Sequence, residues 1–156
     1  MFTIDKKLII TWMAFILWMA LIFAFSSQPS EETNHLSISV SQIMLKNKAA
    51  ISLGINGSTD AITMFNSIIR KFAHFFLYFI LGLLLMYAIG KSGVHGLKAC
   101  LLSALVCAVY AAGDELHQWF VPGREASVMD IFIDTAGAAA GILTYMMIAG
   151  LRRQKS

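Results

Sequence analysis

The chain has 156 residues, of which 58% are apolar and 13% are charged. Soluble domains carry about 25% charged residues, so this composition excludes an ordinary soluble globular protein. It indicates an integral membrane protein with a single domain over residues 1–156. The formal net charge is only +3, and the basic residues cluster at the ends of apolar runs, so we expect no nucleic-acid partner.

Four apolar runs follow one another along the chain, and the first covers residues 8–25. It is 18 residues long, follows two lysines and contains two tryptophans. The apolar region of a signal peptide is only about 7–15 residues long, so this run predicts a retained transmembrane helix. Pro29 cannot continue a helix, and the polar residues 30–59 predict a loop with a short interfacial segment.

The second predicted helix begins near Thr59 and has an amphipathic first part. Apolar residues in this part recur at spacings of three and four, which is the periodicity of one helix face. We expect it to run directly into the second transmembrane helix, at about residues 72–89. The apolar stripe consists of Ile62, Phe65, Ile69 and Phe72.

The third apolar run, at about residues 97–113, is short for a membrane span of roughly 20 residues. The helix can be completed by continuing through Gly113 into the polar segment that follows. Pro122 and Gly123 then form a turn pair, and the fourth transmembrane helix covers about residues 128–149. The predicted fold is therefore an all-α polytopic membrane protein, with four transmembrane helices and an amphipathic helix preceding the second.

The distribution of lysine and arginine predicts the orientation in the membrane. With four spans, both termini and the turn at residues 90–96 lie on the same side. That side carries seven of the twelve basic residues but only one of the nine acids. We therefore predict a multi-pass protein of the cell membrane with both termini in the cytoplasm, and with the loops at residues 26–71 and 114–127 outside.

Polar residues gather at the predicted outer ends of the helices. Lys71, His74 and Tyr78 recur at spacings of three and four, so they share one helix face. Asp114 and Gln118 share a face of the next helix, whereas Glu115, between them, is expected to point elsewhere. Ionisable groups at the edge of a membrane span are costly, which favours a functional role. The sequence therefore predicts one outward-facing polar pocket between helices.

The last predicted helix carries a small-xxx-small pattern, in which Gly137 and Gly141 allow close helix packing. Asp130 and Asp134 lie on the same face, so this seam would bring them against a neighbouring helix. Arg124 follows the Pro-Gly turn, where its guanidinium suits a phosphate or carboxylate ligand. The alternative role for Arg124 is an anchor to lipid phosphate.

A carboxylate beside a histidine suits acid–base chemistry, so the candidate catalytic residues are His74, Asp114 and His117. The same groups are equally suited to tying helices together by hydrogen bonds. These three and Asp130 offer oxygen and nitrogen ligands, but no metal-binding spacing such as HExxH is present. We therefore predict a site without a metal and a chain without a cofactor. The candidate ligand-binding residues are Lys71, Tyr78, Glu115, Gln118, Arg124, Asp130 and Asp134.

Taken together and in this order, these motifs resemble the VanZ-like family, the teicoplanin-resistance-protein-like membrane proteins. The resemblance runs from about Ser26 to Gly141 and includes the Ser-Ser-Gln-Pro end of the first helix. Asp134 departs from the pattern, because the family often has Asn there. The resemblance implies a small multi-span bacterial membrane protein, and the family's named member is linked to resistance to the glycopeptide teicoplanin.

The resemblance further implies that the outer pocket acts on or binds a component of the cell envelope and thereby affects glycopeptide susceptibility. The implied partner is an envelope lipid, a lipid-linked wall precursor or the glycopeptide itself. An enzyme at the outer leaflet and a non-catalytic binding or shielding module both fit the residues. A small transporter fits less well, because the inner halves of the predicted spans are almost purely apolar. The sequence leaves the oligomeric state open.

Overall fold

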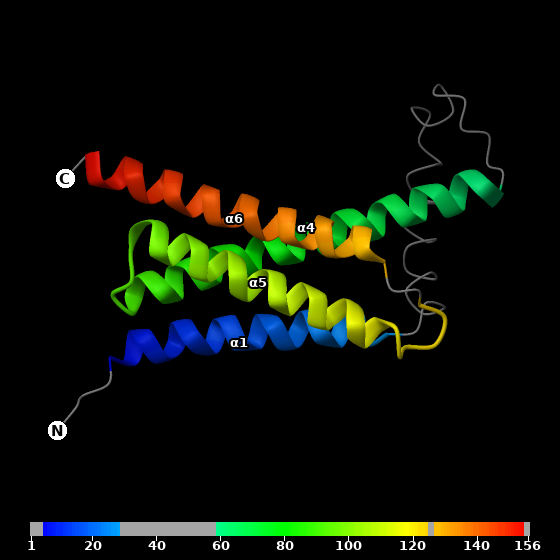
Figure 1. The fold of residues 1–156 in the computed structure, drawn as a ribbon, viewed down its shortest axis with the longest axis horizontal. Helices are drawn as coiled ribbons and strands as arrows, with labels where there is room; N and C mark the ends of the chain where they lie inside the picture. Colours follow the sequence, from blue (N-terminus) through cyan, green and yellow to red (C-terminus); the bar gives the residue numbers. More distant parts are fainter. Residues whose placement is uncertain (1–4, 29–58, 125–126, 155–156) are drawn as a thin grey trace.

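The computed structural model of the chain describes residues 5–28, 59–124 and 127–154. The predicted interfacial segment between residues 30 and 59 lies outside these ranges. The described part of the chain is built from helices and contains no strand (Figure 1). The helices are α1 (Lys6–Ser26), α4 (Thr59–Lys91), α5 (Gly96–Gln118) and α6 (Val128–Gln154).

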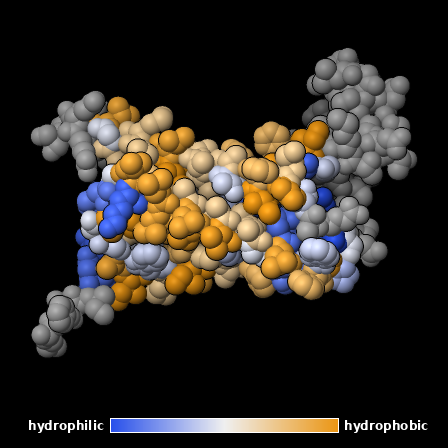
Figure 2. Space-filling model, in the orientation of Figure 1, coloured by the Kyte–Doolittle hydropathy of each residue, from blue (hydrophilic) through white to orange (hydrophobic). Residues whose placement is uncertain are grey.

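All four helices are long and apolar enough to cross a membrane, which confirms the predicted all-α, four-span fold. Large apolar side chains such as Ile10, Leu17 and Leu101 are exposed, as expected where lipid surrounds the helices. Figure 2 shows the same arrangement as a broad hydrophobic middle between two more hydrophilic ends. The spans cover Lys6–Ser26, Ser67–Lys91, Gly96–Gln118 and Val128–Leu151.

Two helices extend beyond their most apolar segments. The helix α4 is continuous from Thr59 to Lys91, so the segment before the second span and the span itself form one helix. The helix α5 continues through Gly113 to Gln118. This continuation gives Asp114 and its polar neighbours fixed helical positions at the end of the span, instead of placing them in a loop.

The closest helix pair is α4 and α6, which cross with their backbones in contact. A Cβ atom added at Gly137 would overlap the carbonyl oxygen of Phe75, and one added at Gly141 would overlap that of Phe79. On the opposing helix, a Cβ atom at Gly82 would overlap a backbone carbonyl of α6 in the same way. The small-xxx-small seam therefore packs against α4, because only glycine permits this approach.

The remaining contacts join α1 and α5 to this pair. The indole N–H of Trp18 donates to the carbonyl of Leu77 at 2.9 Å, which fixes α1 on α4. The hydroxyl of Tyr110 donates to the carbonyl of Met19 at 2.7 Å, which fixes α5 on α1. The helices alternate in direction, so α1 and α5 end where α4 and α6 begin (Figure 1). This common end carries the polar residues and is called the polar end below.

Candidate functional site

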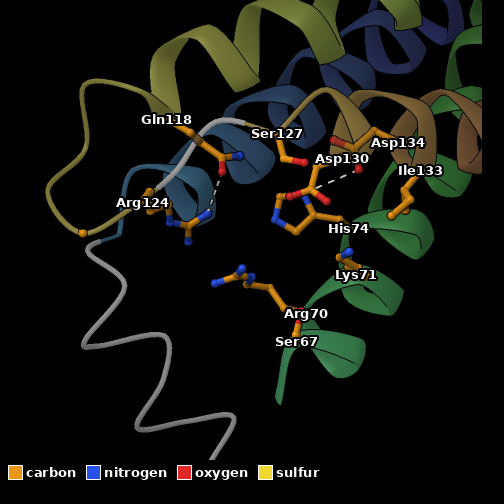
Figure 3. A pocket seen from close by; sticks show the side chains of 11 residues that line it. Ser67, Arg70, Lys71, His74, Gln118, Arg124, Ser127, Asp130, Ile133 and Asp134 are labelled. Carbon is orange, nitrogen blue, oxygen red and sulfur yellow. Dashed lines mark hydrogen bonds and ion pairs between the residues drawn. The ribbon is translucent and has the colours of Figure 1, made fainter. Parts of the chain in front are cut away.

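A cavity of about 450 Å³ opens at the polar end between α4, α6 and the connection from α5 (Figure 3). We call it the polar cavity. Basic residues reach it from α4, and acidic residues reach it from α6. Its lining consists of Ser67, Arg70, Lys71, His74, Gln118, Gly123, Arg124, Ser127, Asp130, Ile133 and Asp134.

Asp114 lies at the centre of a buried hydrogen-bonded group. The hydroxyl of Ser26 donates to its Oδ2 at 2.6 Å, and the amide of Gln118 donates to the same oxygen at 3.3 Å. All three side chains are buried. A short hydrogen bond to an ionised carboxylate is stronger than a neutral one, so this group ties the end of α1 to α5. The other oxygen, Oδ1, has no hydrogen-bond partner among the described residues.

Arg124 connects the loop after α5 to the end of α1. Its Nη1 donates to Oε1 of Gln118 at 3.1 Å, its Nε to the carbonyl of Gln28 at 3.1 Å, and its Nη2 to the carbonyl of Phe25 at 3.2 Å. Cations are favourable at a helix C-terminus, where backbone carbonyls lack helical partners. Burial lowers the pKa of the guanidinium, and the positive charge of Arg70 lowers it further. The group still remains charged at neutral pH.

Glu115 links α5 to the start of α6. Its Oε2 accepts a hydrogen bond from the backbone N–H of Ser127 at 2.9 Å. Ser127 immediately precedes α6, where backbone N–H groups lack helical partners and favour negative charge. The side chain of Glu115 is buried, and its partner Ser127 is not part of the group around Asp114.

His74 and Asp134 face each other across the seam between α4 and α6. The distance from Nδ1 of His74 to Oδ1 of Asp134 is 3.5 Å, and the two side chains are 15% and 0% exposed. Neither carboxylate oxygen of Asp134 has a hydrogen-bond partner in the described ranges. Asp114 lies close by: one ligand atom from each of His74, Asp114 and Asp134 lies within 4.8 Å of the others. Among the described residues, these three form a group that could hold a metal ion.

The structure brings most of the predicted site residues together. Lys71, His74, Gln118, Arg124, Asp130 and Asp134 line the polar cavity. Figure 3 shows these residues converging from α4, α6 and the end of α5. Asp114 is buried behind Gln118 and belongs to the same cluster. Lys71 makes no ion pair with an acid in the described part of the chain, although Asp114 and Asp130 are its expected partners.

Besides Asp114, three predicted residues do not line the cavity, namely Tyr78, Glu115 and His117. Tyr78 is fully buried one turn below His74, and its hydroxyl has no hydrogen-bond partner among the described residues. His117 lies against α1, where its Nε2 is 3.1 Å from Oγ of Ser27. Its ring also lies on Phe23, with 4.5 Å between the ring centroids. The three candidate catalytic residues therefore do not form one group, because His117 is separated from His74 and Asp114.

Arg70 and Ser26 were not among the predicted site residues. Arg70 lies one helical turn before His74 and reaches the polar cavity, so a spacing of four from His74 would have identified it. Ser26 holds Asp114 from another helix. The sequence signals for Ser26 are its position at the polar end of the first apolar run and its place in the Ser-Ser-Gln-Pro motif, and neither reveals the residue it contacts.

A second cavity of about 340 Å³ adjoins the polar cavity. We call it the side groove. It lies between the end of α1 and α4, and its own lining is mainly apolar. Arg70, His74 and Arg124 line both cavities, so they form the boundary between a polar and an apolar surface. The other residues of the side groove are Phe25, Gln28, Ile69, Ala73, Phe76 and Leu77.

Comparison with protein families identifies a match over most of the chain. The model of the VanZ/LLP1 family matches residues 11–149. This range includes every residue of the polar cavity and of the side groove. No significant match was found among curated proteins or among solved structures.

Proposed function

The chain belongs to the VanZ/LLP1 family, and from this premise we propose that its polar end binds the anionic headgroup of an envelope lipid or a lipid-linked wall precursor. The observation that carries the proposal is the shared boundary of the polar cavity and the side groove. An amphiphile has a charged part and an apolar part. The polar cavity would hold the charged part, and the adjoining side groove would hold the apolar part. The lipid surroundings of the four spans supply such ligands directly.

The cations of α4 support an anionic headgroup. Arg70 and Lys71 line the polar cavity, and neither forms an ion pair with an acid in the described ranges. A guanidinium recognises phosphate or carboxylate in a bidentate manner, and lysine adds a point charge. Arg124 also lines the cavity, but three of its hydrogen bonds hold the protein itself. Its contribution to the ligand is therefore secondary to that of Arg70.

The side groove supports an apolar tail. Phe76 is 60% exposed and Phe25 is 48% exposed, although both are large apolar side chains. A hydrocarbon chain that lies along them remains in an apolar environment while its headgroup reaches Arg70. A soluble anion would use only the polar cavity, so the groove favours a ligand that remains attached to the membrane.

The orientation rule places this site at the outer leaflet of the cell membrane, with both termini in the cytoplasm. Envelope lipids and lipid-linked wall precursors present their headgroups there. By binding or changing such a molecule, the protein alters the surface that a glycopeptide such as teicoplanin meets. This is the route by which we expect it to affect glycopeptide susceptibility.

Catalysis on the bound headgroup is a second candidate function. It is favoured by the contact between His74 and Asp134, because a histidine oriented by a carboxylate can serve as a general base. The variant His74→Gln separates the two candidates. A binding module keeps its ligand and its effect in this variant, whereas an enzyme keeps the ligand and loses the chemical change.

The proposal is tested with the purified full chain in detergent. Native mass spectrometry would measure binding of undecaprenyl phosphate and phosphatidylglycerol, with phosphatidylcholine as the zwitterionic control. We expect the two anionic lipids to bind more tightly. Arg70→Gln should weaken them roughly tenfold or more, because a hydrogen bond to a charged group contributes about 1.5–3 kcal/mol. Lys98→Gln is the control, since Lys98 is exposed at the opposite end of the bundle.

Equal binding of all three lipids, or equal loss in Arg70→Gln and Lys98→Gln, would contradict the proposal. A cellular test then compares teicoplanin susceptibility in a Gram-positive host. The strains carry the wild type, Arg70→Gln, Lys98→Gln or an empty vector, with matched amounts in the membrane. We expect the wild type and Lys98→Gln to shift susceptibility together, and Arg70→Gln to match the vector.

A further inference from the structure

His74 and Asp134 line the polar cavity, and Asp114 is buried next to them, so the three residues bring ligand atoms together from three different helices. We propose that these three residues bind one divalent metal ion, with Zn²⁺ as the preferred ion. The site would supply one imidazole nitrogen and two carboxylate oxygens. The four possible metal ligands identified from the sequence were His74, Asp114, His117 and Asp130. The proposed site keeps His74 and Asp114 and has Asp134 in place of the other two.

The distances suit such an ion. In tetrahedral zinc sites the metal–ligand distances are about 2.0–2.2 Å, so neighbouring ligand atoms are roughly 3.4 Å apart. The distance from Nδ1 of His74 to Oδ1 of Asp134 is 3.5 Å. The ligand atom of Asp114 lies within 4.8 Å of both. A small movement of the Asp114 carboxylate toward the other two ligand atoms would bring it to the tetrahedral spacing.

The unpaired oxygens give an independent reason for a cation at this position. Asp134 is 0% exposed; its Oδ1 has only the ion-pair contact with His74 at 3.5 Å, and neither of its oxygens has a hydrogen bond in the described part of the chain. Asp114 is also buried, and its Oδ1 is similarly unpaired. Burying a carboxylate without a partner is very unfavourable, so buried charges are paired or coordinate metals. One divalent cation neutralises both carboxylates.

Neighbouring residues orient the proposed metal ligands, as the outer shell of a metal site does. Ser26 and Gln118 both donate to Oδ2 of Asp114, which orients the carboxylate and leaves Oδ1 for the metal. The contact between Gly137 and Phe75 fixes α4 against α6, next to His74 and one turn from Asp134. The distance between two of the three ligands is thereby set by backbone packing.

The mixed ligand set determines the preferred metal. Mg²⁺ prefers an octahedral shell of oxygens, whereas an imidazole ligand favours Zn²⁺ or a related transition metal. Three protein ligands leave a fourth position open, as in catalytic zinc sites. This position faces the polar cavity, where Arg70 also lies. The metal proposal stands without the proposed lipid ligand, although an anionic headgroup would fit the open position.

The test uses the tag-free full chain in detergent, first stripped with EDTA. Isothermal titration with ZnCl₂ and with MgCl₂ would measure affinity, and elemental analysis after desalting would count bound metal. We expect one Zn²⁺ per chain and much weaker binding of Mg²⁺. His74→Gln and Asp134→Asn should weaken Zn²⁺ at least 10–100-fold, the range found even for outer-shell changes.

The matched controls are His117→Gln and Asp5→Asn, which change the same residue types outside the polar cavity and should keep Zn²⁺. Circular dichroism would verify the helices of every variant. If a ligand variant does not fold, X-ray absorption of the wild type with Zn²⁺ decides. Only nitrogen and oxygen neighbours with one imidazole support the site, whereas sulfur from Cys100 or Cys107 overturns it.

Absence of stoichiometric Zn²⁺, or undiminished Zn²⁺ in both ligand variants, would overturn the metal site. The lipid experiment distinguishes this failure from a failure of the proposed function. If the protein binds anionic lipids but does not bind Zn²⁺, only the proposed metal site is rejected. If the protein binds Zn²⁺ but does not select anionic lipids, only the proposed lipid-binding function is rejected.

Discussion

The two halves of the α4–α6 pair are built in opposite ways. Towards the middle of the bundle, Gly137 and Gly141 bring the helix backbones into contact, and the fit depends on the absence of side chains. At the polar end, His74 and Asp134 face each other as large polar side chains with unpaired atoms. The tight half supplies the rigidity that an unsatisfied polar site requires, because packed supporting residues keep ligand atoms in place.

The polar end repeats this contrast on a smaller scale. On the side of α1, Ser26, Gln118 and Arg124 all have hydrogen-bond partners. On the side of α4 and α6, atoms of His74 and Asp134 lack hydrogen-bond partners among the described residues. The hydrogen-bonded groups on the side of α1 join helices, whereas His74 and Asp134 line the polar cavity. We therefore expect His74 and Asp134, more than Ser26 and Gln118, to be available to a ligand.

The largest effect is expected from filling the seam. In Gly141→Leu, the new Cβ atom would overlap the carbonyl oxygen of Phe79, and a backbone atom cannot rotate away. Overpacking an ordinary core costs about 1–3 kcal/mol, and this clash should exceed that range. The melting temperature in detergent, followed by circular dichroism, should fall sharply.

The matched control for the seam is Gly150→Leu, on the same helix. Nothing lies within 4 Å of a Cβ atom at Gly150, so the melting temperature should remain close to that of the wild type. Similar melting temperatures for the two variants would mean that close backbone contact does not hold α4 against α6. The glycine seam would then not be the source of rigidity in the α4–α6 pair.

An intermediate effect is expected from the paired side of the polar end. Ser26→Ala removes a 2.6 Å hydrogen bond to the buried carboxylate of Asp114. Such charged hydrogen bonds contribute about 1.5–3 kcal/mol, so the free energy of unfolding should fall by about this amount. Ser27→Ala is the matched control, because Ser27 is only half-buried and its hydroxyl contacts the Phe23 carbonyl and the His117 ring instead of a buried carboxylate. Denaturant titration would compare the two, and a larger loss in Ser27→Ala would contradict the assignment.

The fold was predictable because it depends on long apolar runs that each cross the membrane once. The length of α5 also followed from the sequence, since residues 97–113 alone are short for a span and no proline blocks continuation. The approximate location of the polar cluster followed from chain direction. Alternating helices bring the same ends together, whatever their packing angles are.

The partners within the site were not predictable, because they depend on helix rotation and on the conformation of the connection. Glu115 is buried, and its partner is the backbone N–H of Ser127, which lies 12 residues further along the chain. His117 is only three residues from Asp114, yet it lies against Ser27 on α1. The contact between His74 and Asp134 required knowledge of the register at which the glycine seam meets α4.

The smallest change in the free energy of unfolding is expected when two tyrosines are replaced by phenylalanine. This comparison tests whether a buried polar group near His74 is unpaired. The hydroxyl of Tyr78 is fully buried without a hydrogen-bond partner among the described residues, whereas that of Tyr110 donates to Met19 at 2.7 Å. Tyr110→Phe should lower the free energy of unfolding by about 0.5–1.5 kcal/mol, the usual net value of a hydrogen bond. Tyr78→Phe removes an unsatisfied polar group, so it should raise the stability by up to about 1 kcal/mol. A loss in Tyr78→Phe as large as that in Tyr110→Phe would show that the Tyr78 hydroxyl is paired, and that the unpaired region ends at His74 and Asp134.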